Sequence, residues 1–398
     1  MSRPRSAFLT ACALAAATVA AGCGNKDQPR AVDKPSIGVK GTEKEVARDL
    51  GFPAFATKNT TRIGGADPAA DAVGAARAVF SGATPLTRPR AVALVDSTDP
   101  RAALAAAVLM SAPVRAPMLF SQGRDLSPGT QDALDALAPR GSRAAGDAQI
   151  IRVGDAARPK DLRTTDIRGK DIFSLARALD AFQAAARGTT SDRLMIVGAG
   201  DPAYAMPAAA WAAKSGDPLL FTEKDRLPAD TRAAIASHQQ PKIYVVGPKT
   251  VVSDKVVKQL RSLGTVKRIQ GPDPTLNSVA FARFLDGDFG WGVVDPGHGL
   301  VFAGADRPLD AGAAAPLSAT GTYGPLIVVK DRDTLPRKLE QFLLDIQPGY
   351  DKDPVRGVYN HAWLIGDESV LSVKAQSRID ALLEIVPVQE QKSASASQ

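Results

Sequence analysis

Six basic side chains lie in turns that follow short apolar runs, or just inside the helical segments after those turns. They are Arg101, Arg124, Arg226, Lys249, Arg307 and Arg332. In a parallel βα sheet, these turns form a crevice outside the carboxyl ends of the strands, where helix N-termini present backbone N–H groups to anions. Taken singly, each cation is also explained as a solvated surface charge. Their recurrence along the chain favours several weak contacts with phosphate or carboxylate groups of one polyanion.

Three aspartates recur beside these cations. Asp99, Asp201 and Asp306 each lie between an apolar run and a helical segment, with a proline one or two residues later. An aspartate at this place caps the helix, which is worth on the order of 1 kcal/mol, and proline has the first helical φ already set. The pattern predicts helix caps, with contact to a ligand as the alternative. Asp225 and Asp333 have the same interpretation.

Motifs for nucleotide or acid-base chemistry are incomplete. Gly198-Ala199-Gly200 follows an apolar run but lacks the third glycine of a dinucleotide fingerprint. Gly247-Pro248-Lys249-Thr250 lacks the upstream glycine of a phosphate loop, and Pro248 has no N–H to donate. Asp295 to Gly299 is a polar glycine-rich cluster that suits a loop better than acid-base work. No nucleophile elbow is present, so we predict no catalytic residues.

Metal binding has no support in the sequence either. His238, His298 and His361 share no ligand spacing. Of the two cysteines, Cys12 lies inside a predicted leader and Cys23 is the predicted site of the lipid anchor. The sequence therefore predicts neither a metal nor a cofactor.

The elements that must position the cations are clearest between Arg193 and Gly271. Three apolar runs, at 194–197, 219–222 and 243–246, each lead through a turn into a helical segment. This is the pattern of parallel βα units.

The unit recurs with a period near 100 residues. Ile63, Ile167 and Ile269 lie in similar motifs spaced by 104 and 102 residues, and Asp99 and Asp201 are 102 apart. A third copy follows, with an added segment from Pro348 to His361. Only 13 residues separate Gly154 from Ile167, so we expect the last helix of the first copy to be cut short. Repetition on this scale predicts an array of similar domains.

Composition agrees with a large globular core and a weakly basic surface. Of 398 residues, 44% are hydrophobic but only 5% aromatic, so packing must rely on small residues and closely approaching helices. The formal charge of +7 favours an anionic partner only weakly, and we predict no nucleic-acid binding.

The N-terminus predicts export and a lipid anchor. Arg3 and Arg5 precede an uncharged apolar stretch from Ala7 to Ala21, which is typical of a secretory leader. Ala20-Ala21-Gly22-Cys23 resembles a bacterial lipobox with alanine where leucine is usual. The resemblance implies cleavage after residue 22 and lipidation of Cys23 at the outer face of the cell membrane. The alternative is a cleaved secreted protein. A tether at 23–58 and a disordered tail at 388–398 complete the expected organisation.

These motifs resemble the cell-wall-binding repeat type 2 family. The family pattern is a strand, an Asp turn and an alanine-rich helix, followed by the motifs "VYIVGG..AVSD" and "RIAG.DR". The first motif is matched best by VVGPKTVVSD at Val245 to Asp254, and the second by KRIQGPD at Lys267 to Asp273. Two positions depart from it. The Arg-Tyr pair after the opening Asp is absent, and Gly-Gly after the third strand is replaced at Gly154-Asp155, Gly247-Pro248 and Gly366-Asp367.

The resemblance implies an α/β fold of three tandem Rossmann-like or toprim-like domains packed as a triangle. We place their boundaries at 59–161, 162–264 and 265–387. It also implies a non-catalytic envelope protein that binds an anionic wall polymer, peptidoglycan or another glycan. The alternatives are a modifier or partner of an amidase-type wall hydrolase, and a solute-binding lipoprotein.

Overall fold

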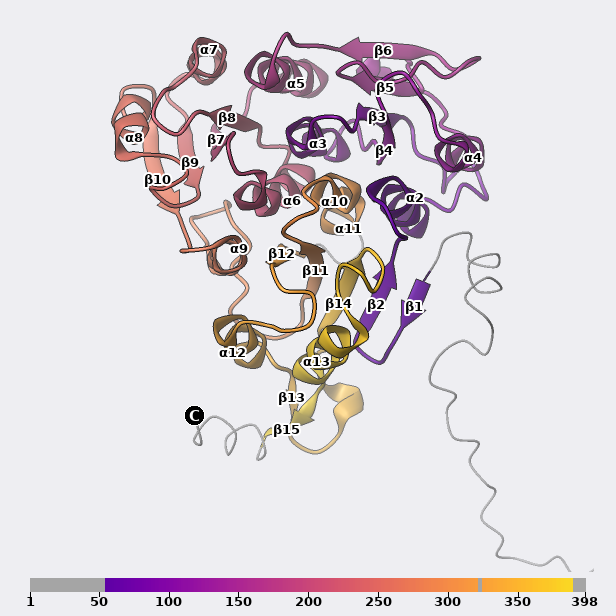
Figure 1. Ribbon diagram of the computed structural model, residues 1–398, viewed down its shortest axis with the longest axis vertical. Coiled ribbons are helices and arrows are strands. Elements are labelled where there is room, and N and C mark those ends of the chain that lie inside the picture. The colour runs from indigo at the N-terminus through magenta and orange to yellow at the C-terminus, as the bar shows by residue number, and fades with distance from the viewer. Residues whose placement is uncertain (1–53, 321–323, 389–398) are drawn as a thin grey trace, which may run out of the picture. The chain divides into compact units, whose positions relative to one another are not determined.

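The fold is built from parallel βα units in three sheets. The computed structural model describes residues 54–320 and 324–388 (Figure 1). Cys23, the leader, most of the tether and residues 389–398 of the tail lie outside these ranges. Residues 54–56, predicted as the end of the tether, instead form an edge strand, because their backbone pairs with residues 61–63.

The first two sheets have four parallel strands each, in the same order. The first has the order β4 (Met118–Ser121), β3 (Val92–Asp96), β5 (Ile150–Val153), β6 (Thr164–Ile167). The second has the order β8 (Leu219–Thr222), β7 (Arg193–Gly198), β9 (Lys242–Val246), β10 (Thr265–Ile269). The central strands are buried, as their continuous apolar runs require of sheets covered on both faces.

The third sheet repeats this order with strands from both ends of the described chain. Its order is β12 (Leu326–Val329), β11 (Gly299–Gly304), β14 (His361–Ile365), β2 (Thr60–Ile63), with β1 (Ala54–Ala56) antiparallel at the edge. In Figure 1 the indigo strand β2 lies beside the yellow strand β14. A short pair, β13 (Gly349–Tyr350) and β15 (Val386–Pro387), lies apart from the three sheets.

The strand that opens each sequence copy completes the sheet of another copy. β6 pairs with β5, β10 pairs with β9, and β2 pairs with β14. The helices that follow these three strands cover the next sheet. These are α5 (Ile172–Arg187) on β8, α9 (Pro274–Arg283) on β12, and α2 (Pro68–Val79) on β4. The predicted boundaries at 162 and 265 are therefore out of phase with the sheets by one strand, and the third sheet needs residues 60–63.

Two of the three strands that complete a sheet, β2 and β10, each carry an arginine that holds the strand in place by hydrogen bonds. Arg62 on β2 is 7% exposed and donates hydrogen bonds to the backbone oxygens of Gly366 (3.0 Å) and Leu371 (2.6 Å). Arg268 occupies the same position on β10 and donates to the backbone oxygens of Gly247 and Val252, both at 2.8 Å. Each side chain thus satisfies carbonyl groups in the loop that follows the third strand.

Short alanine-rich helices carry the contacts between the sheets. They are α3 (Pro100–Ala106), η1 (Ala107–Met110), α6 (Met206–Ser215), α10 (Leu309–Ala313) and α11 (Ala315–Ala319). α6 contacts η1 and α11, and α10 contacts α2 and α3. A Cβ added to Gly312 would lie 3.0 Å from the backbone oxygen of Ala103, so only glycine permits this approach of α10 to α3. Small residues here let helices lie close, as the composition predicts.

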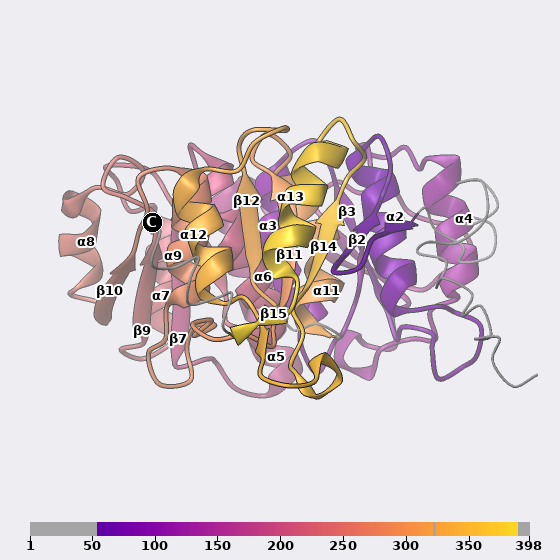
Figure 2. The same ribbon diagram turned by 90° about the horizontal axis from the view of Figure 1, so that it is seen from below.

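The remaining helices of the described ranges are distributed around the sheets. They are α4 (Pro128–Leu137), η2 (Arg143–Ala145), η3 (Pro202–Tyr204), α7 (Ala229–Ser237), α8 (Asp254–Leu260), α12 (Arg337–Asp345), η4 (Pro354–Arg356) and α13 (Val373–Leu383). Figure 2 shows α12 and α13 in front of the third sheet, where they bury a second apolar cluster that includes Phe302, Phe342 and Ile379. No helix occupies residues 154–163, so the prediction of a shortened first copy is confirmed. The triangular arrangement stays a prediction.

Candidate functional site

The predicted aspartate caps occur in two of the three copies. Asp99 accepts from the backbone N–H of Arg101 at 3.0 Å, and Asp201 accepts from that of Ala203 at 3.2 Å. Asp306 does not cap a helix, because α10 begins at Leu309 with Pro308 as its N-cap and no side-chain cap, and the alternative of ligand contact stays a prediction. Proline stands one residue later here than in the Asp-Pro turns, so the helix begins later as well.

Four of the six predicted cations lie exposed at the carboxyl ends of strands. Arg124, Arg226 and Lys249 have side chains that are 81%, 67% and 67% exposed, and Arg332 is also exposed. Each has a local partner: Asp155, Glu223, Asp254 and the backbone oxygen of Glu368, respectively. Exposed ion pairs of this kind contribute only about 0–1 kcal/mol, so a polymer anion can replace the partner at little cost. We call these four residues the exposed rim.

The other two cations are held in the fold. Arg101 binds the carboxylate of its neighbour Asp99 through Nε and Nη2, both at 2.8 Å, and this hydrogen bonding raises the pKa of Arg101. Arg307 is only 14% exposed and pairs with Asp71 and Asp310, whose side chains are fully buried. The Arg307 guanidinium already neutralises buried carboxylates, and its contact with a polymer stays a prediction.

The cluster of Asp71, Arg307 and Asp310 joins α2 to α10. Asp71 accepts from the backbone N–H of Gly65 at 2.7 Å, and Arg307 Nε lies 3.0 Å from Asp310 Oδ2 as an ion pair without hydrogen-bond geometry. Burial raises the pKa of Asp71 to about 6 and that of Asp310 well above its ordinary value. Two carboxylates share one cation here, so the cluster favours holding a proton. In the sequence, an isolated Asp71 within an alanine-rich helix was the available signal.

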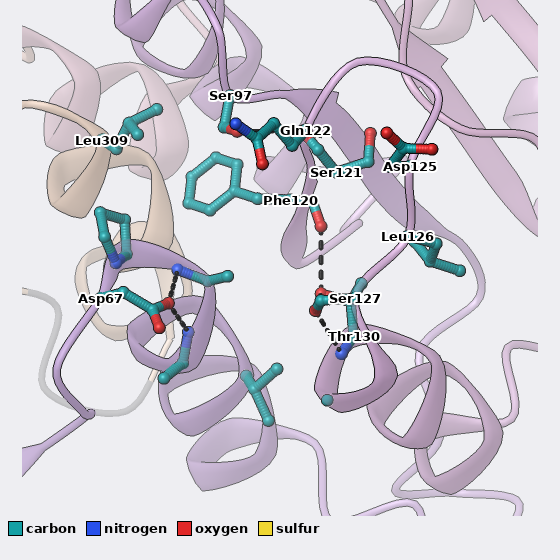
Figure 3. Close-up of a pocket in the computed structure, with 15 residues that line it drawn as sticks. Asp67, Ser97, Phe120, Ser121, Gln122, Asp125, Leu126, Ser127, Thr130 and Leu309 are labelled. Atoms are coloured by element: carbon teal, nitrogen blue, oxygen red, sulfur yellow. Dashed lines mark hydrogen bonds between the residues drawn. The ribbon is translucent and has the colours of Figure 1, made fainter.

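A cavity of about 840 Å³ opens at the carboxyl end of the first sheet, and this is the candidate site (Figure 3). Its walls come from four segments: the start of α2, the turn after β3 at Ser97, the stretch from the end of β4 to the start of α4, and α10. It lies at the β3–β4 side of the sheet, beside the crevice between β3 and β5 where connections leave in opposite directions. Sequence reasoning missed it, because its walls are far apart in the chain.

The polar groups of the cavity fall into two sets. Some are committed to the fold: Ser97 Oγ donates to the backbone oxygen of Ser121 at 3.0 Å, and Thr130 Oγ1 donates to that of Phe120 at 3.1 Å. Others have unused capacity. Within the described ranges, the side chains of Gln122 and Asp125 have no hydrogen-bond partner. Asp67 uses one carboxylate oxygen, Oδ1, for Ala69 and Ala70 and leaves Oδ2 unpaired within those ranges.

The cavity's lining excludes some chemistry. None of its lining residues is lysine, arginine or histidine, so it holds neither a cation for an anionic ligand nor a histidine base for its serines. Across residues 54–320 and 324–388, no group of three or more His, Cys, Asp or Glu is placed to hold a metal ion. In the same ranges, no helix has the length and apolar character needed to cross a bilayer.

The glycine motifs have packing roles. A Cβ at Gly198 would lie 2.9 Å from the backbone oxygen of Val251, so glycine there admits the neighbouring loop. Gly247 has a φ of +128°, which L residues rarely adopt, and Lys249 is paired with Asp254 at 2.7 Å. In the cluster from Asp295 to Gly299, Asn360 Oδ1 accepts from the backbone N–H groups of Gly297 and His298, which fixes the loop.

Three sheets of parallel βα units with the same strand order define a mixed α/β fold. Residues 167–257 match the model of the family described as Cell wall binding domain 2 (CWB2). This match confirms the predicted resemblance to the cell wall binding domain 2 family. The matched stretch begins at the last residue of β6, so the family unit has the phase of the sequence copy and not of the sheet. A domain of this family indicates a location at the cell envelope.

Curated relatives include two proteins of Bacillus subtilis (strain 168). The chain is 33% identical over 128 residues to the amidase enhancer, which is 32% of this chain and 17% of that relative. It is 34% identical over 143 residues to N-acetylmuramoyl-L-alanine amidase LytC, which is 36% of this chain and 27% of that relative. The match therefore spans about a quarter or less of each relative.

Solved structures extend the likeness of the fold over most of the chain. Cwp6 from Clostridium difficile aligns with a TM-score of 0.67 at 17% identity, over 83% of this chain and 49% of that one. Cwp8 from the same organism aligns with a TM-score of 0.62 at 18% identity, over 82% and 52%. At these identities the likeness shows the fold alone, and it confirms the predicted mixed α/β class with parallel βα units.

Proposed function

We propose that this chain is a non-catalytic protein of the cell envelope that binds an anionic wall polymer or glycan through three cell-wall-binding repeats. The observation that carries the proposal is the cell wall binding domain at residues 167–257 within a fold whose first and third sheets repeat the second. The exposed rim supports an electrostatic contribution, because its members lie where parallel strands end in all three sheets.

Attachment to the outer face of the cell membrane through lipidated Cys23 is part of the proposal. It rests on the leader and lipobox-like residues, which lie outside the described ranges. Metabolic labelling with an alkyne fatty acid is expected to mark the full chain but not the Cys23→Ser variant. Labelling of both forms would overturn the anchor without affecting wall binding.

Co-sedimentation with purified cell walls tests the central proposal. Walls are compared before and after removal of anionic polymer with hydrofluoric acid, which cleaves phosphodiesters. We expect the chain to pellet with untreated walls and to remain largely in solution with treated ones. Equal pelleting with both would contradict recognition of an anionic polymer, and no pelleting with either would contradict wall binding altogether.

A second function is favoured by one comparison. A relative named as an amidase enhancer aligns with about a third of this chain. The second candidate function is therefore that of a modifier or partner of a peptidoglycan hydrolase. The readout is the rate at which a purified N-acetylmuramoyl-L-alanine amidase lowers the turbidity of a wall suspension. A faster or slower rate with added chain supports this alternative, and an unchanged rate contradicts it. Small-ligand thermal-shift screening tests the remaining alternative, a solute-binding lipoprotein.

A further inference from the structure

The cavity beside α2 has a size and shape suited to a small ligand unit. Its volume of about 840 Å³ lies within the roughly 300–1,000 Å³ of small-molecule sites. Figure 3 shows Asp67 on one side and Ser127 and Thr130 on the other, with the side chains of Phe120 and Gln122 above them in this view. Such a site selects its ligand by the groups that its walls offer.

The unpaired polar groups are hydrogen-bond acceptors and one amide. Asp125 and the free oxygen of Asp67 accept hydrogen bonds only, whereas the Gln122 amide both donates and accepts. In the described ranges these groups have no protein partner, so a bound molecule can use all of them. Hydroxyl groups suit this set, because each hydroxyl donates to a carboxylate and accepts from an amide.

Charge argues against an acidic ligand at this place. Two carboxylates border the cavity and no basic side chain lines it. A phosphate or carboxylate would be repelled by them, since like charges raise the free energy of binding. The exposed rim, by contrast, presents cations to solvent. The cavity and the rim therefore suit different parts of one polymer.

Apolar surface completes the lining. Val73, Leu126 and Leu309 lie among the polar groups, and the buried ring of Phe120 contributes to the same lining. The C–H groups of a sugar ring pack on such surface while its hydroxyls point outward to acceptors. A site with apolar walls and a few convergent polar groups binds molecules of that mixed character.

At the corresponding turn before α9, a tyrosine forms a hydrogen bond that the cavity beside α2 does not have. Tyr204 stands three residues after Asp201, as Leu309 does after Asp306, and its hydroxyl donates to the backbone oxygen of Pro272 at 3.0 Å. Pro272 directly precedes Asp273, the N-cap of α9, just as Ala66 precedes Asp67, the N-cap of α2. Leu309 has no hydroxyl, so it cannot form this bond at the turn before α2.

We propose that the cavity formed by α2, the β4–α4 loop and α10 binds an uncharged, hydroxyl-rich saccharide unit. The inference rests on the proposed wall-binding function and deepens it, because it assigns one sugar-binding position to a defined part of the fold. The sugar comes either from a wall polymer or from the glycan strands of peptidoglycan. The same chemistry serves both, so the experiment separates the two sources.

The ligands for the test come from one treatment of purified walls. Hydrofluoric acid releases the saccharides of the polymer into solution and leaves bare peptidoglycan as a pellet. An anion exchanger divides the released saccharides into uncharged and charged pools. Calorimetry with the uncharged pool, calorimetry with the charged pool and co-sedimentation with the pellet then form three arms.

Two variants disturb the cavity without a predicted clash. A Cβ at Gly129 meets no atom within 4 Å, so Gly129→Phe places a ring at the cavity wall from a helical backbone position. Asp125→Ala removes an exposed carboxylate acceptor. Matched controls lie in the second copy: Gly200→Phe, whose Cβ also meets nothing within 4 Å, and Asp225→Ala, an exposed aspartate in the corresponding β8–α7 loop.

We expect the uncharged pool or the bare peptidoglycan to bind wild-type protein, and the arm that binds identifies the source. Gly129→Phe and Asp125→Ala should weaken that binding at least tenfold, whereas the two controls should match wild type. Equal affinity in all five proteins, or binding of the charged pool alone, would overturn the sugar site. Absence of binding in every arm would overturn it as well.

Failure of the inference is distinguishable from failure of the proposed function. If untreated walls pellet all variants as they do wild type, and the uncharged saccharides do not bind, wall binding stands and the sugar site falls. The opposite result is also possible: the protein does not co-sediment with untreated walls, yet uncharged saccharides bind to it and Gly129→Phe abolishes that binding. In that case the sugar site stands and the wall-binding function falls.

Discussion

Ile63 and Ile365 are paired neighbours in the third sheet, although they lie near the opposite ends of the described chain. The first long strand thereby completes the last sheet, and Arg62, next to Ile63, fixes it through carbonyl groups of the loop after β14.

Arg62 is expected to be a major determinant of stability. Arg62→Ala removes the donor to three backbone oxygens, those of Gly366, Asp367 and Leu371, and to Gln376 Oε1, and these acceptors lose that partner. The expected loss is roughly 2–4 kcal/mol in the free energy of unfolding, measured by urea titration. Arg168→Ala, which removes a 59% exposed cation, serves as control and should change stability by less than about 0.5 kcal/mol. Similar losses of unfolding free energy in both variants would contradict a specific stabilising role of the Arg62 hydrogen bonds.

The buried cluster at α2 and α10 should make stability depend on pH. The folded-state pKa of Asp71, about 6, is above its ordinary value of 3.8, so between about pH 4 and 6 the folded state binds more protons than the unfolded state. The free energy of unfolding must then fall as pH rises through this window, by on the order of 3 kcal/mol for the Asp71 carboxyl. Asp71→Asn should flatten this fall. Parallel pH curves for the variant and wild type would show that Asp71 does not carry it.

His238 should contribute stability that is lost at higher pH than the contribution of Asp71. Burial lowers its pKa, but the hydrogen bonds to Asp180 and to the backbone oxygen of Ser191, both at 2.8 Å, raise it by more, so the net shift is upward. A raised histidine pKa gives stability that is fully present below about pH 6.5 and is lost as pH rises through the folded-state value. Thermal unfolding of His238→Gln should show a lower melting temperature at pH 6 and a smaller difference from wild type at pH 9. An equal deficit at both pH values would exclude an imidazolium.

The exposed rim should control the salt dependence of wall binding. A variant with Arg124, Arg226, Lys249 and Arg332 all changed to alanine is expected to bind untreated walls at least tenfold more weakly in low salt. The deficit should shrink at 1 M salt, where the Debye length is about 3 Å. Lys258→Ala, an exposed cation on α8, is the single-site control. Unchanged binding of the fourfold variant would remove the rim from the mechanism.

The sequence predicts local features of this fold well. Buried strands, proline-led helix starts and the spacing of Ile63, Ile167 and Ile269 all depend on neighbouring residues or on repetition. It does not predict which sheet a strand joins, because that choice depends on contacts distant in the chain. Grouping Asp306 and Arg307 with the earlier Asp-Pro turns missed a one-residue shift in the proline. The burial of Arg307 also depends on Asp71, whose proximity no local pattern reveals. The cavity could not be predicted for the same reason, since four separate segments of the chain form it.

The placement of β2 also determines how two copies of this chain can become entangled. Until β2 docks, β14 offers an unpaired parallel edge, and the β2 of a neighbouring molecule carries the same Thr60–Ile63 sequence that fits it. Closure between molecules would preserve every strand pair and the Arg62 contacts while linking two chains. Exchange of β2 between two molecules would therefore give a domain-swapped dimer, whereas docking of β2 within one molecule gives the monomeric fold.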